Sequence, residues 1–452
     1  MLFFAALLGC QSPDGALRAV DVQLGETIPN VLEARYEADA AGESWVRWGY
    51  SEDALTHETA HRTMSPGAME HLVVGPASGR TVFVQLVTQP DGGDEETSAV
   101  VSLDVPVAPS GLPRLYAEGT PGDEGLLLTA ILSLDSGWVI LTNAEGEIAW
   151  YMPLAYQEIT SSVQVSLDGE ALLVLLQDAF DNVTGTELLR VGWDGVLIER
   201  TKLPSGHHDF VELADGRIAW IQDETITMEI DGEQRPVIGD AIQVTEQGGE
   251  AQQDAEPIFS LFDYHTPSAT CQHQQSPISW QDKTALDWSH LNSLTYDAQT
   301  DRFFAVSHFL DSVYVISASD GALIDEVNPY VDYRMVMGGK PWSHPHSSWM
   351  RDGELLMFDN GMHHEPQVSR VARYTYDEER REMTQTWEYN HPNNGFAVAL
   401  GDAHPTPSGN ILIAWSPFGQ IAEVNDAKEV VWTLETEAGA GIGRARWVTE
   451  LP

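Results

Sequence analysis

Histidines gather in three short motifs of the C-terminal half. The motifs are His207-His208-Asp209, Asp287-Trp288-Ser289-His290-Leu291-Asn292-Ser293, and His344-Pro345-His346 followed by Phe358-Asp359-Asn360-Gly361. Imidazoles can attack as nucleophiles, move protons and, when protonated, hold anions. Two of the motifs precede a turn and an apolar run, in HHDFVELADGRIAWI and HSSWMRDGELLMFDNG, and His404 in HPTPSGNILIAW repeats the pattern. In a repeating β fold such positions can converge on one axis, so we expect a single site built from distant segments.

Each of these residues also has a structural interpretation. A histidine before a turn can simply hydrogen-bond a backbone carbonyl and clamp neighbouring strands. The Asp359-Asn360-Gly361 sequence is typical of a structural turn, and His363-His364 is expected in a solvent-exposed loop.

The elements that would position the histidines are strands. Residues 114–452 repeat one phrase, an apolar strand, a DG-like turn and a second strand that often ends near Trp, as in GWVILTNAEGEIAWYMP and SVYVISASDGALIDEV. Hairpins that recur at roughly 40–60 residues indicate the blades of a β-propeller. Residues 240–285 break the rhythm and are expected to form a long insertion or loop over one face.

An N-terminal region precedes the repeats. Residues 17–107 predict short alternating strands separated by turn residues, which is typical of a fibronectin III or immunoglobulin-like β-sandwich. The Pro/Gly-rich stretch VPVAPSGLP at 105–113 marks the boundary. We therefore predict an all-β chain with a small sandwich at 17–107 and a propeller at 114–452.

The charge of the chain restricts its partners. The 452 residues include 69 acidic and 23 basic side chains, a formal net charge of −46. Such a surface repels nucleic acids and anionic membranes, and both are excluded as partners. The acidic residues are spread along the chain, so the charge predicts a solvated surface.

The first 16 residues predict export. The run MLFFAALLGC ends at Cys10 before a polar QSPDG, which is similar to a bacterial lipoprotein signal, although a basic n-region is missing. We expect lipidation of Cys10, an envelope location and membrane contact through that lipid alone. An ordinary secretory signal is the alternative. Acylation of Cys10 would leave Cys271 without a disulfide partner.

Residues from about 135 to 448 resemble the bacterial arylsulfotransferases, PAPS-independent enzymes that pass a sulfuryl group between phenols. The resemblance is carried by HHDFVELADG, DWSHLNSLTYDAQTDRFFAVS, HSSWMRDGELLMFDNG, SRVARYTYDEERREMTQTWEY and the terminal GRARW. It implies a six-bladed propeller with an N-terminal β-sandwich, an aryl sulfate donor, a phenolic acceptor and a histidine nucleophile that is transiently sulfated.

Matched residue by residue, the resemblance implies that His346 is the nucleophile. It implies that His290 and Asn292 contact the sulfuryl group and that His208, rather than His207, matches the histidine of the HHD motif. One position departs, because His308 in Val306-Ser307-His308 stands where the family usually has arginine. An arginine offers a sulfate a permanent, forked charge and a histidine does not.

The chemistry is consistent with these assignments. Attack at sulfur develops negative charge that fixed donors or cations must meet. The histidines, among them His207, His308 and His404, could supply such groups, with Arg334, Lys340 and Arg370 as nearby basic residues. No GxxxxGKS/T phosphate loop is present, so we expect no nucleotide, no metal and no other cofactor.

Two other interpretations stay open. One is a non-catalytic, envelope-tethered propeller that binds a ligand or a protein. The other is a metal-dependent propeller hydrolase, which His344 and His346 permit but for which the sequence offers neither cysteine ligands nor suitably spaced carboxylates.

Overall fold

A computed structural model describes residues 17–133, 136–156, 158–160, 162–178, 186–230, 232–252, 255–268, 271, 275–280, 283–437 and 440–452. Within these ranges the chain folds into strands and two 3₁₀ turns, η1 (Leu261–Asp263) and η3 (Ser416–Phe418), without an α-helix. The all-β prediction is therefore confirmed. In the same ranges no helix is long and apolar enough to cross a bilayer. Cys10 and the predicted signal lie outside the described residues.

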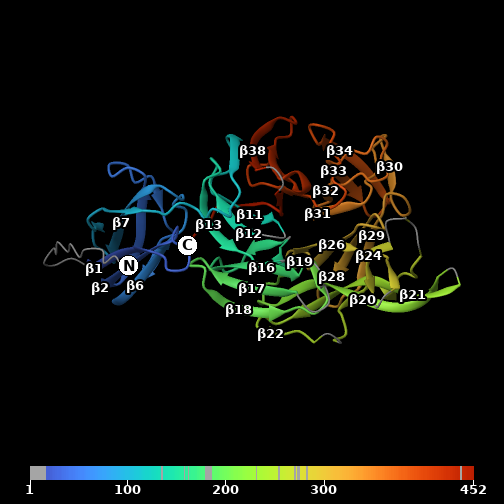
Figure 1. The fold of residues 1–452 in the computed structure, drawn as a ribbon, viewed down its shortest axis with the longest axis horizontal. Coiled ribbons are helices and arrows are strands. Elements are labelled where there is room, and N and C mark those ends of the chain that lie inside the picture. The colour runs from blue at the N-terminus through green and yellow to red at the C-terminus, as the bar shows by residue number, and fades with distance from the viewer. Residues whose placement is uncertain are drawn as a thin grey trace.

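The N-terminal strands form a separate lobe of two sheets (Figure 1). One sheet holds β1 (Leu17–Leu24), β2 (Leu32–Ala38) and β6 (Gly67–Val73). The other holds β3 (Gly42–Gly49), β4 (His57–Glu58), β5 (Arg62–Met64), β7 (Thr81–Pro90), β8 (Glu96–Thr97) and β9 (Val101–Asp104). Alternate side chains of β2 and β7 are buried in a core shared by the two sheets, as expected for strands with one solvated face. The domain limits 17–107 and 114–452 stay predictions.

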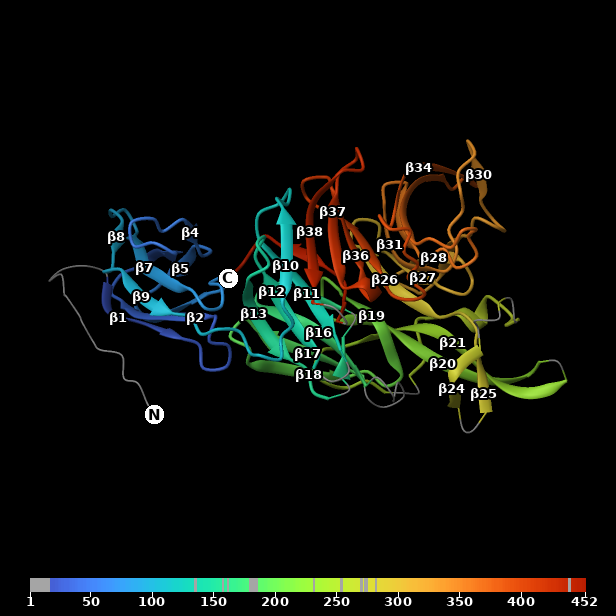
Figure 2. The same cartoon turned by 45° about the horizontal axis from the view of Figure 1, so that its top comes forward.

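The remaining strands form a β-propeller, whose described residues make six sheets (Figures 1 and 2). The first sheet contains β11 (Leu126–Leu132), β12 (Trp138–Thr142), β13 (Ile148–Pro153), β39 (Gly441–Ile442) and β40 (Arg446–Val448). The second contains β14 (Glu158–Ile159), β15 (Val163–Val165), β16 (Ala171–Asp178), β17 (Glu187–Gly192), β18 (Leu197–Lys202) and β22 (Gly249–Glu250). The third contains β19 (Gly206–Glu212), β20 (Ile218–Ile230), β21 (Glu233–Thr245), β23 (Phe259–Ser260), β24 (Gln275–Trp280) and β25 (Lys283–Asp287).

The other three sheets follow in chain order. The fourth contains β26 (Leu291–Asp297), β27 (Arg302–Ser307), β28 (Ser312–Ser317) and β29 (Leu323–Val327). The fifth contains β30 (Arg334–Val336), β31 (Pro345–Arg351), β32 (Glu354–Asp359), β33 (Arg370–Asp377) and β34 (Glu382–Asn390). The sixth contains β35 (Asp402–Pro405), β36 (Ile411–Trp415), β37 (Gln420–Val424), β38 (Val430–Thr436) and, from much earlier in the chain, β10 (Leu115–Gly119).

Both ends of the propeller segment close the ring. Strand β10 pairs antiparallel with β38, while β39 and β40 pair with β11. The first sheet thus receives strands from the C-terminus, and the last receives one from the N-terminal side. Because pairing across the closure removes two free edges, the ring is held by backbone hydrogen bonds as well as packing.

Tryptophans fasten neighbouring sheets at their outer strands. The indole of Trp150 donates to the carbonyl of Trp193 at 2.8 Å, and that of Trp432 donates to the carbonyl of Ala144 at 2.7 Å. Each bond joins the outer part of one sheet to a turn in the next, and each indole is fully buried. The recurring Trp in the sequence phrase is therefore a clamp that fixes the sheets relative to one another.

The described part of residues 240–285, which the sequence predicted to be a long insertion or loop, contains strands. Strands β20 and β21 make a hairpin of two 13-residue strands that projects from the propeller (Figure 2), and β25 pairs in parallel with β21. Strand β21 also pairs with β23 and contacts η1. The described part of the segment is thus an extension of the third sheet.

Candidate active site

The histidines stand at the inner ends of adjacent sheets. Strands β19, β26, β31 and β35 each form one edge of their sheet. Strand β19 contacts β26, β26 contacts β31, and β31 contacts β35. His208, His290 and His344 have φ values of 58°, 51° and 55°, in the left-handed region that side chains rarely adopt. A register shift follows each of them, at His207/Phe210, Leu291/Ser293 and Pro345/Ser347. The repeated bulge re-aims side chains at the start of each inner strand.

The bulges bring the imidazoles together. We use the term histidine cluster for His207, His208, His290, His308, His344 and His346. Ring centroids lie 4.8 Å apart for His208 and His290, 6.1 Å for His208 and His346, and 5.6 Å for His290 and His308. His308 lies 4.9 Å from His344. Residues more than 130 positions apart therefore share one site, as the spacing of the motifs indicated.

His346 has the properties of a neutral nucleophile. Its Nδ1 lies 2.9 Å from the carbonyl oxygen of Gly401, which can only accept, so Nδ1 carries the proton and Nε2 keeps its lone pair. Burial, reinforced by the positive charge of Arg444, lowers the pKa of His346 to about 3. The ring is uncharged at neutral pH and can attack through Nε2.

His207 and His208 form a hydrogen-bonded pair in which His207 is protonated and His208 is neutral. Burial would lower the pKa of His207, but Asp223 and Asp240, 3.0 and 3.1 Å from its Nε2, outweigh burial and raise the pKa to about 10. Its Nδ1 lies 2.7 Å from Nδ1 of His208. Desolvation, with the charges of His290 and His207, holds the pKa of His208 well below the usual range. The protonated His207 therefore donates, and the neutral His208 carries its proton on Nε2.

His290 lies beside His208, and its pKa is shifted in the opposite direction. Burial opposes its charge, but Asp287 accepts from its Nδ1 at 2.8 Å and raises the pKa of His290 above the ordinary value. The raised pKa favours the protonated form of His290, which can give a proton to a leaving group. The DW-x-H spacing places this carboxylate three residues before its histidine.

Arg444 brings a permanent positive charge that the sequence analysis did not assign. It lies between β39 and β40, lines one small cavity with His346 and Gly401, and donates through Nη2 to the carbonyl of Asn292 at 2.7 Å. Its Nη1 lies 3.1 Å from Asp209. Its buried Nε has no hydrogen-bond partner among the described residues. A donor in this state can meet a sulfuryl oxygen.

His308 does not replace an arginine's charge. Burial and the charges of His290 and His344 hold its pKa well below the ordinary value, so the ring is neutral at pH 7 in the anion-free protein. Its Nδ1 donates to the carbonyl of Pro345 at 3.1 Å, and Asn292 donates to the same carbonyl at 3.0 Å. His308 and Asn292 both lie in the cluster, where they fix the backbone just before His346.

Two residues that were predicted to help bind the substrate, Arg370 and His404, supply no free positive charge to the site. Arg370 is buried, and its guanidinium donates to Asp359 at 2.8 Å, to Glu388 at 2.7 Å and to Tyr374 at 3.0 Å, within the fifth sheet. These partners occupy it, so its assignment to the substrate is corrected to a structural role. His404 lies on the inner strand β35, and burial together with Arg446 lowers its pKa to about 3. It therefore supplies no positive charge to the site.

The loop prediction for His363-His364 holds for one residue only. His363 is exposed, whereas His364 is buried, with its Nε2 3.2 Å from the carbonyl of Pro341. The sequence offered no cysteine near His344, but the structure brings one close. The Sγ of Cys271 lies 3.5 Å from Nε2 of His344.

The site can now be compared with known proteins. The family model described as Arylsulfotransferase (ASST) matches residues 125–324. The match includes His207, His208, His290, Asn292 and His308, and it ends before His346 and Arg444. No curated protein matches the chain.

Several solved propellers resemble the structure distantly. The Cps50 (Swd1) β-propeller domain of Myceliophthora thermophila is 13% identical, over 71% of this chain and 86% of that one, with a TM-score of 0.35. Virginiamycin B lyase from Staphylococcus aureus is 14% identical, over 71% of this chain and 98% of that one, with a TM-score of 0.34. We draw no functional conclusion from similarities at this level.

Proposed function

We propose that this chain, whose residues 125–324 match the arylsulfotransferase family model, moves a sulfuryl group from an aryl sulfate to a phenolic acceptor. The observation that carries the proposal is the state of His346. Its Nδ1 is committed to Gly401 and its pKa is lowered to about 3, so Nε2 is a neutral nucleophile. The imidazole of His290, whose pKa is raised, and the guanidinium of Arg444 both act electrostatically on His346.

In the first half-reaction, Nε2 of His346 attacks sulfur. The N–S bond forms while the bond from sulfur to the aryl oxygen breaks, and the leaving phenoxide takes the proton of the His290 imidazolium. Arg444, which lines a cavity with His346, and the Nε2–H of His208, whose ring centroid lies 6.1 Å from that of His346, would meet the sulfuryl oxygens. The product is a sulfated His346 and a released phenol.

The second half-reaction reverses these roles. The acceptor's oxygen attacks sulfur, the N–S bond breaks, and the acceptor's proton passes to the now neutral His290. The cluster returns to its starting charge, and no nucleotide is consumed. Because a chain of net charge −46 repels an anionic donor at long range, the donor must be attracted locally, and Arg444 is the cation of the site whose Nε has no partner among the described residues.

The experiment is turnover of 4-nitrophenyl sulfate with phenol as acceptor, read as released nitrophenol. We expect turnover by the wild type and loss of it in His346→Asn. His391→Asn is the matched control, because His391 is a buried imidazole that packs on Trp415 and Phe418 rather than in the histidine cluster. Equal turnover by His346→Asn and the wild type would refute the role of His346. Absence of turnover in the wild type with any aryl sulfate would favour a binding propeller.

A further inference from the structure

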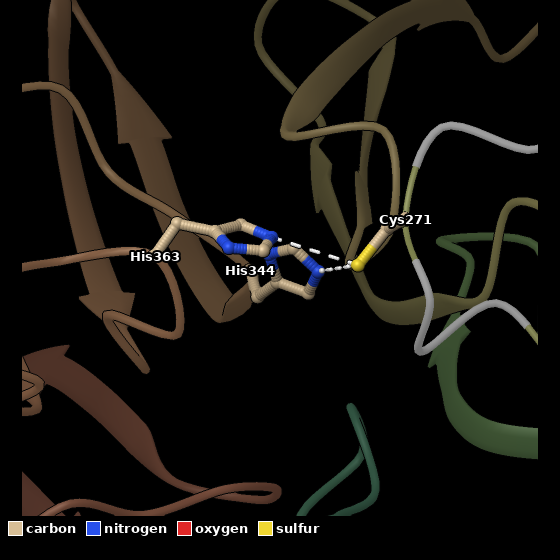
Figure 3. A group of neighbouring side chains, drawn as sticks. All are labelled: Cys271, His344 and His363. Carbon is tan, nitrogen blue, oxygen red and sulfur yellow. Dashed lines mark hydrogen bonds between the residues drawn. The ribbon is translucent and has the colours of Figure 1, made fainter.

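A second group of side chains with ligand chemistry shares His344 with the histidine cluster. The Sγ of Cys271 lies 3.5 Å from Nε2 of His344 and 3.5 Å from Nε2 of His363 (Figure 3). One donor atom of each residue lies within 4.8 Å of the other two. Figure 3 shows both imidazoles directing a nitrogen at the sulfur from the opposite side of the group.

Three separate segments supply this group. His344 stands just before β31, His363 follows β32, and Cys271 belongs to the stretch between η1 and β24. The backbone N–H of His363 donates to Oγ of Ser343 at 3.1 Å, which ties the two histidine segments together. His344 is buried and His363 is exposed, so the group opens toward solvent on one side. A metal ion could therefore enter, and a position for water could remain.

The distances fit zinc. Zinc bonds to sulfur at about 2.3 Å and to imidazole nitrogen at about 2.0–2.1 Å, and at a tetrahedral angle two such bonds place S and N about 3.6 Å apart. The two observed separations of 3.5 Å match that edge. A thiolate with two neutral imidazoles is also a ligand set of the softness that zinc prefers over calcium or magnesium.

The surroundings of His344 suit a ligand that binds through Nε2. A histidine that binds a metal through Nε2 carries its proton on Nδ1, and a nearby oxygen usually accepts a hydrogen bond from that N–H. The Nδ1 of His344 lies 3.3 Å from Oγ of Ser343 and 3.8 Å from Oδ1 of Asp311. The backbone N–H of His344 also donates to Oδ1 of Asp311 at 2.6 Å, which fixes the orientation of the residue.

We propose that Cys271, His344 and His363 bind one zinc ion, with a fourth position open to water. The ion would tie the segment of Cys271 to the sheet that carries His346. It would also immobilise His344, whose ring lies 4.9 Å from that of His308. The sequence alone predicted no metal, because Cys271 is 73 residues from His344 and has no ligand-like spacing with it. The zinc site is independent of the proposed sulfuryl transfer.

The test is metal analysis of the full-length protein after zinc loading and gel filtration. We expect about one zinc per chain, and Cys271→Ser and His363→Gln should each weaken zinc binding at least about tenfold. His265→Gln is the matched control, since His265 pairs with Glu326 at 3.1 Å and belongs to neither cluster. Unchanged zinc content in both ligand variants, or no zinc in the wild type, would overturn the proposal.

Two measurements on the wild type keep the test independent of variant folding. Cobalt(II) should give a thiolate-to-metal charge-transfer band, and zinc should slow alkylation of Cys271 as followed by peptide mapping. A second set of side chains, formed by His207, Asp223 and Asp240, could also hold an ion. Cobalt bound there would lack the thiolate band and leave the alkylation of Cys271 unchanged, which would contradict the assignment.

Discussion

The Nδ1 of His346 and the carbonyl oxygen of Gly401 lie 2.9 Å apart, and this contact selects the reactive atom of the site. Because a carbonyl has no proton to give, His346 must donate, and its lone pair is left on Nε2. Gly401 stands one residue before β35, so the sixth sheet fixes the tautomer of a histidine on the fifth. The relative position of two sheets is therefore part of the chemistry.

Arg444 is expected to bind the sulfuryl oxygens. Arg444→Lys keeps the charge and the neighbour Asp209 but loses the forked donors, so kcat/KM for aryl sulfates should fall about 10–100-fold. Arg370→Lys is the control, because Arg370 is buried in ion pairs of the fifth sheet. It should lower the melting temperature and leave KM within about twofold. The reverse pattern would return the sulfate-binding role to Arg370.

The alkaline limit of activity should depend on Asp287. The pKa of His290 is raised by Asp287, and activity that needs the imidazolium is lost as pH rises through that pKa. Asp287→Asn removes the charge, so the alkaline limb of the pH–rate profile should move to lower pH. Asp297→Asn, in a surface turn, should leave the profile in place. An unmoved limb in Asp287→Asn would mean that His290 is not the acid.

Replacing His308 by arginine distinguishes two accounts of the departure from the family pattern. In the structure His308 packs against His290, so a permanent charge there should lower the pKa of His290 and move the alkaline limb to lower pH. If the new guanidinium instead contacts the sulfuryl oxygens, the alkaline side should broaden and turnover should rise. pH–rate profiles of the wild type and His308→Arg decide the direction, and alkaline broadening would show that the new guanidinium contacts the substrate.

His207 should make stability fall at alkaline pH. Its folded pKa of about 10 lies above the unfolded value, so its contribution is complete below pH ~6.5 and is lost as pH rises toward 10. His207→Gln should therefore flatten the decline of the free energy of unfolding across that window, measured by urea denaturation at each pH. His404→Gln is the contrast, because the pKa of His404 is lowered to about 3 and its effect belongs below pH ~6.5. If the free energy of unfolding falls equally with rising pH in the wild type and in His207→Gln, then His207 is not held in its charged form by Asp223 and Asp240.

The sequence predicted that the inner histidines share one site, because each histidine motif stands directly before an apolar strand of the repeat. HHD, DWSHLN and HPH all precede apolar strands, and the repeat places equivalent strands around one axis. The φ values near 50–60° at His208, His290 and His344 were not predictable, since histidine tolerates the left-handed region better than most residues but adopts it only occasionally. The convergence was visible in the sequence, but the orientation of each ring was not.

Arg444 and Cys271 show what the sequence could not supply. Arg444 reaches the site only because β39 and β40 close the ring on β11, a pairing across more than 300 residues. Cys271 lies in the segment that broke the repeat, so no period places it beside His344. Arg370 was assigned to the site from proximity in the motif, and burial against Asp359 and Glu388 decides otherwise.

The central claim is that sulfur is carried on Nε2 of His346, and trapping that intermediate tests it most directly. The protein is incubated with ³⁵S-labelled aryl sulfate without an acceptor, denatured in alkali and digested. We predict alkali-stable, acid-labile label on the peptide that contains His346, released on addition of phenol before denaturation. Label on the peptides of His208, His290 or His308 instead, or none in a protein that still turns over, would contradict the account.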